Sequence, residues 1–188
     1  MKPWQGRLVG CVLTMSVAAG LASCSEPQPQ PSPSPPPTSS SPSPSRTPIS
    51  PTPSAEELDL RAAEKAVSRF WRVIDRLSAD SDTDLTELTT VSRGPVAAQW
   101  ARNINQYRYD QVTTKGRVAV RDASAKQTKD DDLFNVTACI DSSKVNLVDR
   151  NGKSVVPPDG PRRVAYDYTI EKDGQSWYVT REKVTETC

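Results

Sequence analysis

Few side chains in this 188-residue chain could carry catalytic or metal-binding chemistry, and histidine is absent altogether. Its absence excludes Ser-His-Asp and Cys-His catalysis and every metal site that depends on imidazole. A zinc site would have to combine two free cysteines with carboxylates, which is an uncommon ligand set. The sequence therefore predicts no catalytic residue, no metal site and no cofactor. A formal net charge of +1 also argues against nucleic acid as a partner.

Two groups of tyrosines and acids are the candidates for acid–base chemistry. Asp167 lies between Tyr166 and Tyr168, and Asp110 follows Tyr107 and Tyr109. A carboxyl group in an apolar cavity has a raised pKa and can act as a base. In a strand, however, Asp167 points to the face opposite its two neighbours, and the second group is expected in a loop. Packed tyrosine rings with solvated hydroxyls are the simpler explanation of both groups.

Two further motifs have simpler explanations. The adjacent Asp130, Asp131 and Asp132 are not spaced like the ligands of a calcium loop. We expect residues 126–132 to form a solvated, charged loop. Asn135 begins a glycosylation sequon, but it falls inside a predicted strand.

The chain begins like a secreted protein. Lys2 and Arg7 precede an apolar run over 8–20, which is shorter than the roughly 20 residues of a membrane-spanning helix. The segment Leu21-Ala22-Ser23-Cys24 resembles the lipobox of bacterial lipoproteins. This resemblance implies that residues 1–23 are a removed signal peptide, that Cys24 carries acyl chains, and that the protein is anchored to the extracytoplasmic face of the cell membrane. An ordinary signal peptide cut near Ala22 is the alternative.

A tether is expected after the lipidated Cys24, over residues 24–54. Twelve of the thirty residues 25–54 are proline, and almost none is apolar. Such a segment cannot offset its ordering entropy and stays unfolded. Proline favours the extended polyproline II conformation, which would span on the order of 90 Å over thirty residues.

Cys139 and Cys188 remain once the leader is removed and Cys24 is modified. An even pair in an oxidising compartment predicts a disulfide. If the last three strands form a meander, the two cysteines lie on strands that flank a third, with backbones about 9.6 Å apart. A disulfide then requires the chain end to bend across the middle strand. Two free thiols are the alternative.

Helices are expected first in the folded part, 55–188. Ser54 and Glu57 form a capping-box pattern, and one apolar stripe runs to about Ala79. Its members are Ala63, Val67, Phe70, Trp71, Ile74 and Leu77, whereas the opposite face holds Arg61, Glu64, Lys65, Arg69, Arg72 and Asp75. A short helix over 84–91 follows, and Pro95 opens another with Val96, Trp100 and Ile104 on one side.

After Tyr109 the apolar period changes to that of strands. Strands are expected around 115–124, over 134–140 and over 164–170, and from Trp177 to about Thr185. Asn151-Gly152 and Asp173-Gly174 mark turns. Helices followed by an antiparallel meander predict an α+β domain, with the helices packed on one face of a curved sheet.

This order of elements resembles the nuclear transport factor 2-like (SnoaL-like) superfamily. The resemblance rests on the capped helix with Phe70-Trp71, the Cys139-Ile140-Asp141 segment typical of actinobacterial secreted lipoproteins, and the closing Gly174-Gln175-Ser176-Trp177-Tyr178-Val179. It implies a cone-shaped domain with a pocket between helices and sheet. It does not imply an activity, because the superfamily includes enzymes, scaffolds and transport adaptors.

The function expected from the sequence is therefore a lipid-anchored module that binds without catalysis. Its partner would be an envelope protein, a cell-wall component or a small apolar ligand. Two alternatives remain: a pocket enzyme of the isomerase or dehydratase kind, and a purely structural envelope component.

Overall fold

The computed structural model describes residues 52–188, which begin with the long helix α1 (Ala55–Ala79). Ser54 caps this helix: its hydroxyl accepts from the Glu57 N–H at 3.2 Å, and Glu57 accepts in return from the Ser54 N–H at 2.8 Å. A 3-10 helix, η1 (Leu85–Thr90), leads to α2 (Gly94–Tyr109), which has Pro95 in its first turn. The predicted signal peptide, Cys24 and the tether up to residue 51 lie outside the described residues.

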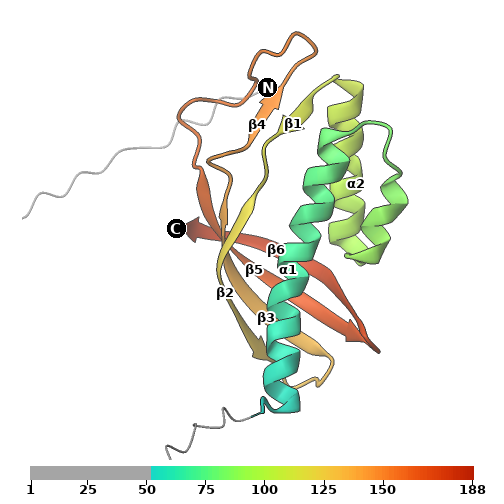
Figure 1. Ribbon diagram of the computed structural model, residues 1–188, viewed down its shortest axis with the longest axis vertical. Helices are drawn as coiled ribbons and strands as arrows, with labels where there is room; N and C mark the ends of the chain where they lie inside the picture. Colours follow the sequence, from blue (N-terminus) through green and yellow to red (C-terminus); the bar gives the residue numbers. More distant parts are fainter. Residues whose placement is uncertain (1–51) are drawn as a thin grey trace, which may run out of the picture. The chain divides into compact units, whose positions relative to one another are not determined.

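Six strands follow the helices and form two antiparallel sheets. The main sheet has the order β2-β3-β5-β6, and a two-stranded arm pairs β1 with β4 (Figure 1). The strands are β1 (Thr113–Lys115), β2 (Ala119–Gln127), β3 (Leu133–Asp141), β4 (Asn146–Val148), β5 (Arg163–Asp173) and β6 (Ser176–Thr187). The last three strands of the main sheet form the predicted meander.

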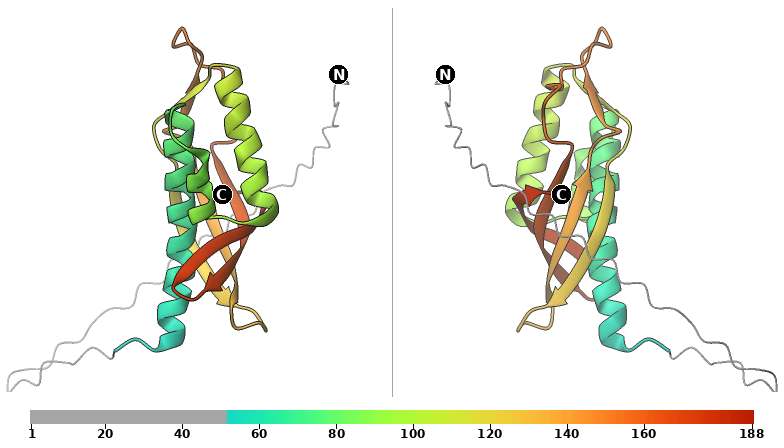
Figure 2. Two further views of the ribbon diagram at one scale, coloured as in Figure 1. Left: turned by 90° about the vertical axis from the view of Figure 1, so that its right-hand side faces the viewer. Right: turned by 90° about the vertical axis from the view of Figure 1, so that its left-hand side faces the viewer.

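The core lies between the helices and one face of the curved main sheet (Figure 2). Phe70 and Leu77 of α1 are fully buried, as are Phe134 of β3 and Ile170 of β5. Helix α1 also covers the edge of β2, where Glu64 accepts from the Ala125 N–H at 3.2 Å. Helices on one face of a curved antiparallel sheet confirm the predicted α+β class.

The predicted strand over 115–124 is wrong in its bounds. Gly116, with φ of +89°, separates β1 from β2, and β2 continues to Gln127. A Cβ atom at Gly116 would lie 1.9 Å from the Lys144 carbonyl oxygen, so the chain can pass there only as glycine. The charged loop begins at Thr128 rather than at 126, and Asp130, Asp131 and Asp132 are exposed in it.

Cys139 of β3 and Cys188, the residue after β6, are joined as a disulfide with 6.0 Å between their Cα atoms. Strand β5 lies between β3 and β6, and Cys139 faces Ala165 in the β3–β5 register. Because 6.0 Å is well below two strand spacings, the chain end leaves the β6 ladder and crosses β5. This is the bend that the sequence argument required.

Asp141 ties the same end of the sheet together. Its buried carboxylate accepts from Arg121 Nε of β2 at 2.9 Å and lies 3.2 Å from Arg163 Nε of β5. Hydrogen bonds from Ser143, together with both arginines, hold the pKa of Asp141 well below its usual range. Through Asp141 and Cys139, the Cys-x-Asp segment of β3 therefore connects β2, β5 and the end of β6.

Candidate functional site

A cavity of about 270 Å³ lies between α1, α2, the main sheet and the β1–β4 arm. Its walls are largely apolar, and four aromatic side chains contribute to them: Trp71, Trp100, Tyr107 and Tyr166. This volume is just below the roughly 300–1,000 Å³ of pockets for drug-sized ligands. A concave, mostly apolar site with a few polar groups is the usual form of a small-molecule site.

Asp75 is the carboxyl group of this cavity. It lies on α1 one turn after Trp71, and only 7% of it is exposed. One of its oxygens accepts from the Val118 N–H at 3.1 Å. Burial raises the pKa of Asp75 to about 6, although the Val118 hydrogen bond and the charge of Arg117 act in the opposite direction. The group therefore exchanges its proton close to neutral pH.

Two buried hydroxyl groups line the same cavity. Ser78 lies three residues after Asp75, so both side chains project from one face of α1. The Ser78 hydroxyl is buried and has no hydrogen-bond partner among the described residues. Thr114 of β1 is also buried. Buried polar groups are normally hydrogen-bonded, so the unpartnered Ser78 hydroxyl leaves a position for a ligand atom or an ordered water.

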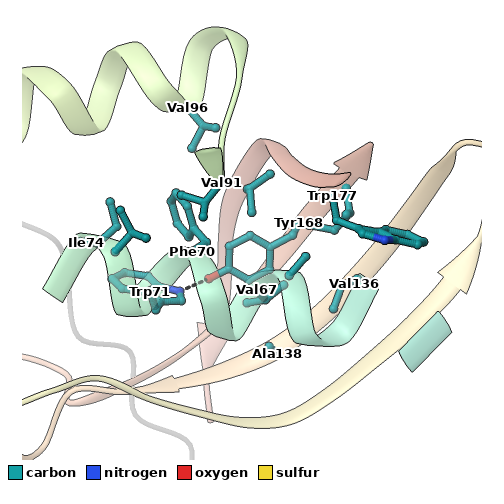
Figure 3. Packing of buried hydrophobic residues seen from close by; sticks show 14 of the residues in the cluster. Val67, Phe70, Trp71, Ile74, Val91, Val96, Val136, Ala138, Tyr168 and Trp177 are labelled. Carbon is teal, nitrogen blue, oxygen red and sulfur yellow. Dashed lines mark hydrogen bonds between the residues drawn. The ribbon is translucent and has the colours of Figure 1, made fainter. Parts of the chain in front are cut away.

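Trp71 and Trp100 are held in place by hydrogen bonds as well as by packing. Trp71 Nε1–H donates to the Tyr168 hydroxyl at 2.8 Å (Figure 3). The two indole rings pack edge to face with centroids 5.3 Å apart. Trp100 Nε1–H donates to Glu182 Oε1 at 2.8 Å. Because Tyr168 is buried and Glu182 is partly buried, these hydrogen bonds hold both rings and the aromatic wall is preformed.

Glu182 supports this wall from β6. Burial raises the pKa of Glu182, and its second oxygen is buried without a partner among residues 52–188. Burial likewise raises the pKa of the Tyr168 phenol. Glu182 is thus a second proton-binding group, and it lies behind the cavity wall.

Arg162 is the second charged side chain that lines the cavity. It stands just before β5, on the side of the sheet, whereas Asp75 stands on α1. Its backbone oxygen accepts from the Ser142 N–H at 2.7 Å, and its guanidinium reaches the Val145 carbonyl oxygen at 3.4 Å. Neither Arg162 nor Asp75 forms a salt bridge with any described residue.

The candidates from the sequence are separated by the fold. Asp167 is exposed on the outer face of β5, while Tyr166 faces the cavity and Tyr168 the core. Tyr107 lines the cavity, but Tyr109 is 84% exposed. The prediction of a loop for this group was wrong, because Tyr107 and Tyr109 belong to the last turn of α2 and Asp110 caps it.

Sequence reasoning missed the two carboxyl groups nearest the cavity. Asp75 was placed on the polar face of α1, and that placement is wrong because the chain between β1 and β2 packs over it through Val118. Glu182 was not singled out. A β-bulge in β6 places Thr180 between the pairs Ile170–Val179 and Thr169–Arg181, so Glu182 turns inward with Tyr168. An acid near the last turn of an otherwise apolar stripe is the one signal that could have indicated Asp75.

Between residues 52 and 188, no three His, Cys, Asp or Glu side chains come together as metal ligands would. Within the same range, no helix combines the length and the apolar character needed to cross a membrane. Asn135 of the sequon is exposed on β3.

Comparison with solved structures supports the fold. The intermembrane space region of the chloroplast protein ARC6 superposes with a TM-score of 0.52 at 17% identity, over 69% of this chain and 98% of that one. Aln2 from a Streptomyces species gives a TM-score of 0.44 at 14% identity, over 71% and 93% of the two chains. At these identities the ARC6 likeness shows a shared fold alone. No family model matches the sequence, and no curated protein sequence matches it.

Proposed function

We propose that this protein is a lipid-anchored extracytoplasmic module that binds a small ligand in the cavity between α1, α2 and the sheet. The anchor would be Cys24, and the proline-rich tether would hold the binding domain away from the membrane. The domain itself would be a nuclear transport factor 2-like module of the secreted actinobacterial kind. The single observation that carries the binding function is a preformed aromatic cavity that contains a buried carboxyl group, Asp75, and a buried hydroxyl group without a partner among the described residues, Ser78.

The polar groups explain why binding is favoured over a structural role. The interior of a protein is normally filled by side chains, and the cavities that remain are apolar and contain no water. This cavity instead contains the Asp75 carboxyl group and the unpartnered Ser78 hydroxyl, each 7% exposed. Leaving a buried hydroxyl group without a partner costs on the order of 1–3 kcal/mol, and a ligand that hydrogen-bonds to Ser78 would recover this energy.

Binding can be tested through the tryptophans. The purified protein is titrated with a library of small amphipathic compounds, and binding is followed by indole fluorescence and by thermal shift. We expect hits whose affinity falls at least tenfold in Ser78→Leu, because the larger side chain fills the cavity. The matched control is Ser81→Leu, an exposed position just after α1, and it should bind like the wild type. If no compound binds, or if Ser78→Leu binds as well as the wild type, the cavity is not the site.

A pocket enzyme is the second candidate, and the pKa of about 6 at Asp75 favours it. A base of this pKa can remove a proton from carbon next to a carbonyl group. Incubation with small ketones in D₂O, followed by NMR, would reveal deuterium incorporation if the cavity acts in this way. Incorporation that disappears in Asp75→Asn would establish catalysis, and its absence from every ketone tested would favour binding alone.

A further inference from the structure

We propose that the ligand of this cavity is a small zwitterion, an amino acid or a dipeptide with an apolar or aromatic side chain, held between Asp75 and Arg162. This inference rests on the proposed binding function and adds the chemical class of the ligand.

The cavity is lined by two charged side chains from the described part of the chain. Among the described residues that line it, Asp75 and Arg162 are the charged ones, and their charges are opposite. They come from different walls, one from helix α1 and one from the start of β5. A ligand that spans the cavity therefore meets a carboxylate at one wall and a guanidinium at the other.

Neither Asp75 nor Arg162 has a partner of opposite charge within the described part of the chain. Asp75 accepts one backbone N–H, from Val118 at 3.1 Å, and Arg162 reaches one carbonyl oxygen at 3.4 Å. The guanidinium of Arg162 has five N–H donors, and among the described residues it donates only to the Val145 carbonyl oxygen. Asp75 is buried and Arg162 is half-buried, and a charge withdrawn from water is stable in a protein when it is paired. An ammonium group would pair with Asp75, and a carboxylate would pair with Arg162 through two parallel hydrogen bonds.

The rest of the cavity wall is largely apolar. Trp71, Trp100, Tyr107 and Tyr166 present aromatic surface, which suits an apolar side chain and also attracts an ammonium group. The Ser78 hydroxyl supplies a further hydrogen bond on the same helix face as Asp75. A cavity volume of about 270 Å³ is below the range of pockets for drug-sized ligands, which favours a ligand of the size of an amino acid or a dipeptide.

Calorimetric titration of the purified protein tests the proposal with matched probes. The zwitterions are phenylalanine and alanyl-phenylalanine, and they distinguish a one-residue from a two-residue ligand. Phenethylamine carries only the ammonium group, 3-phenylpropionate only the carboxylate, and 3-phenylpropanol neither. We expect at least one zwitterion to bind tenfold or more tightly than every probe with a single charge or none.

Two variants assign each charge to its partner. Asp75→Asn should weaken the zwitterion and phenethylamine tenfold or more and leave 3-phenylpropionate unchanged. Arg162→Gln should weaken the zwitterion and 3-phenylpropionate and leave phenethylamine unchanged. Asp131→Asn and Arg150→Gln, at exposed positions, are the matched controls and should bind like the wild type. Circular dichroism checks that each variant is folded, and either variant alone is sufficient to test its half of the proposal.

The outcomes separate this inference from the proposed function. If 3-phenylpropanol binds as tightly as the zwitterions, or if neither variant weakens them, the ligand class is wrong while the cavity still binds. If no probe and no library compound binds, the binding function itself fails, and the zwitterion proposal fails with it.

Discussion

At the scale of single residues, the cost of keeping Asp75 ionised inside the cavity makes stability depend on pH. Its pKa is about 6 in the folded chain and about 3.9 in an unfolded one. Between these values the folded state binds more protons than the unfolded state, so the free energy of unfolding falls as pH rises. The stabilisation from the protonated form is complete below pH 4 and is lost above pH 6. Two pKa units correspond to about 3 kcal/mol at most.

Asp75→Asn should therefore stabilise the protein at pH 7.5 by about 1–3 kcal/mol. The amide oxygen can still accept from the Val118 N–H, and no charge has to be buried. Urea denaturation at pH 4, 5, 6 and 7.5 measures the effect: the difference from wild type should be small at pH 4 and grow to a plateau above pH 6. Asp131→Asn is the control and should follow the wild type at each pH. A stability difference that is independent of pH would contradict the assignment of this titration to Asp75.

Asp75 also shows the limit of predicting burial from the pattern of apolar residues in the sequence. The apolar stripe of α1 predicted which side chains enter the core, because a 3.6-residue period fixes which residues share a face. It placed Asp75 outside that face, and this was wrong, since a backbone N–H forty-three residues later along the chain covers the carboxylate. Burial of a polar residue by a distant segment has no periodic signal.

At the scale of elements, the β1–β4 arm depends on the close passage of Gly116 and Lys144. Gly116→Ala would introduce a Cβ atom 1.9 Å from the Lys144 carbonyl oxygen at a φ of +89°. Gly152→Ala is the matched control, because its φ is +78° but nothing lies within 4 Å. The control should cost about 1–2 kcal/mol from backbone conformation alone. Gly116→Ala should cost at least twice as much and should speed amide exchange in β1 and β4.

If the two alanine variants lower the free energy of unfolding equally, the close approach of Gly116 to Lys144 adds no energetic cost to the substitution. Because the arm contributes Thr114 and Leu147 to the cavity wall, ligand affinity should also fall in Gly116→Ala and stay unchanged in Gly152→Ala.

Element types were predicted well, and element bounds less so, for a physical reason. The alternation in 134–140 and the Asp173-Gly174 turn predicted β3 and the β5–β6 hairpin. The merged strand over 115–124 failed because the register break at Gly116 comes from a contact with Lys144, far along the chain. Glu182 was missed for the same kind of reason: the bulge at Thr180 reverses the alternation of β6, and no local residue pattern announces it.

At the scale of the whole molecule, the disulfide fixes the chain end to β3. It closes a sequence separation of 49 residues, for which chain entropy gives about 4 kcal/mol of stabilisation. Cys139→Ser/Cys188→Ser should lose about this amount in urea denaturation, and dithiothreitol should then have no further effect. Reduced wild type should match the double variant. Two thiols that react with alkylating agent before reduction would contradict the bond.

The order of helices and strands was sufficient to predict the α+β class, because an antiparallel meander needs a layer of helices to bury one face. It was also sufficient to predict that a bond between Cys139 and Cys188 has to cross a strand. The cavity could not be predicted, since it depends on how far α1 and α2 stand from the sheet. The packing of Trp71 against Trp100 and Tyr166 contributes to that distance.

The proposed lipid anchor at Cys24 would decide where the whole protein lies, and Cys24→Ser tests it directly. The proposal requires two or more acyl chains, since a single chain gives only marginal membrane binding. Expressed in a bacterium with lipoprotein-processing enzymes, the wild type should enter the detergent phase on Triton X-114 partition, and intact-mass analysis should show a chain that begins at Cys24 and carries acyl mass. Cys24→Ser should remain in the aqueous phase or retain its leader.

Cys139→Ser/Cys188→Ser is the control that removes two other cysteines without removing the anchor, and it should partition like the wild type. A wild-type chain cut near Ala22 without acyl mass would leave the binding domain free in solution, and its ligand would then have to be sought away from the membrane.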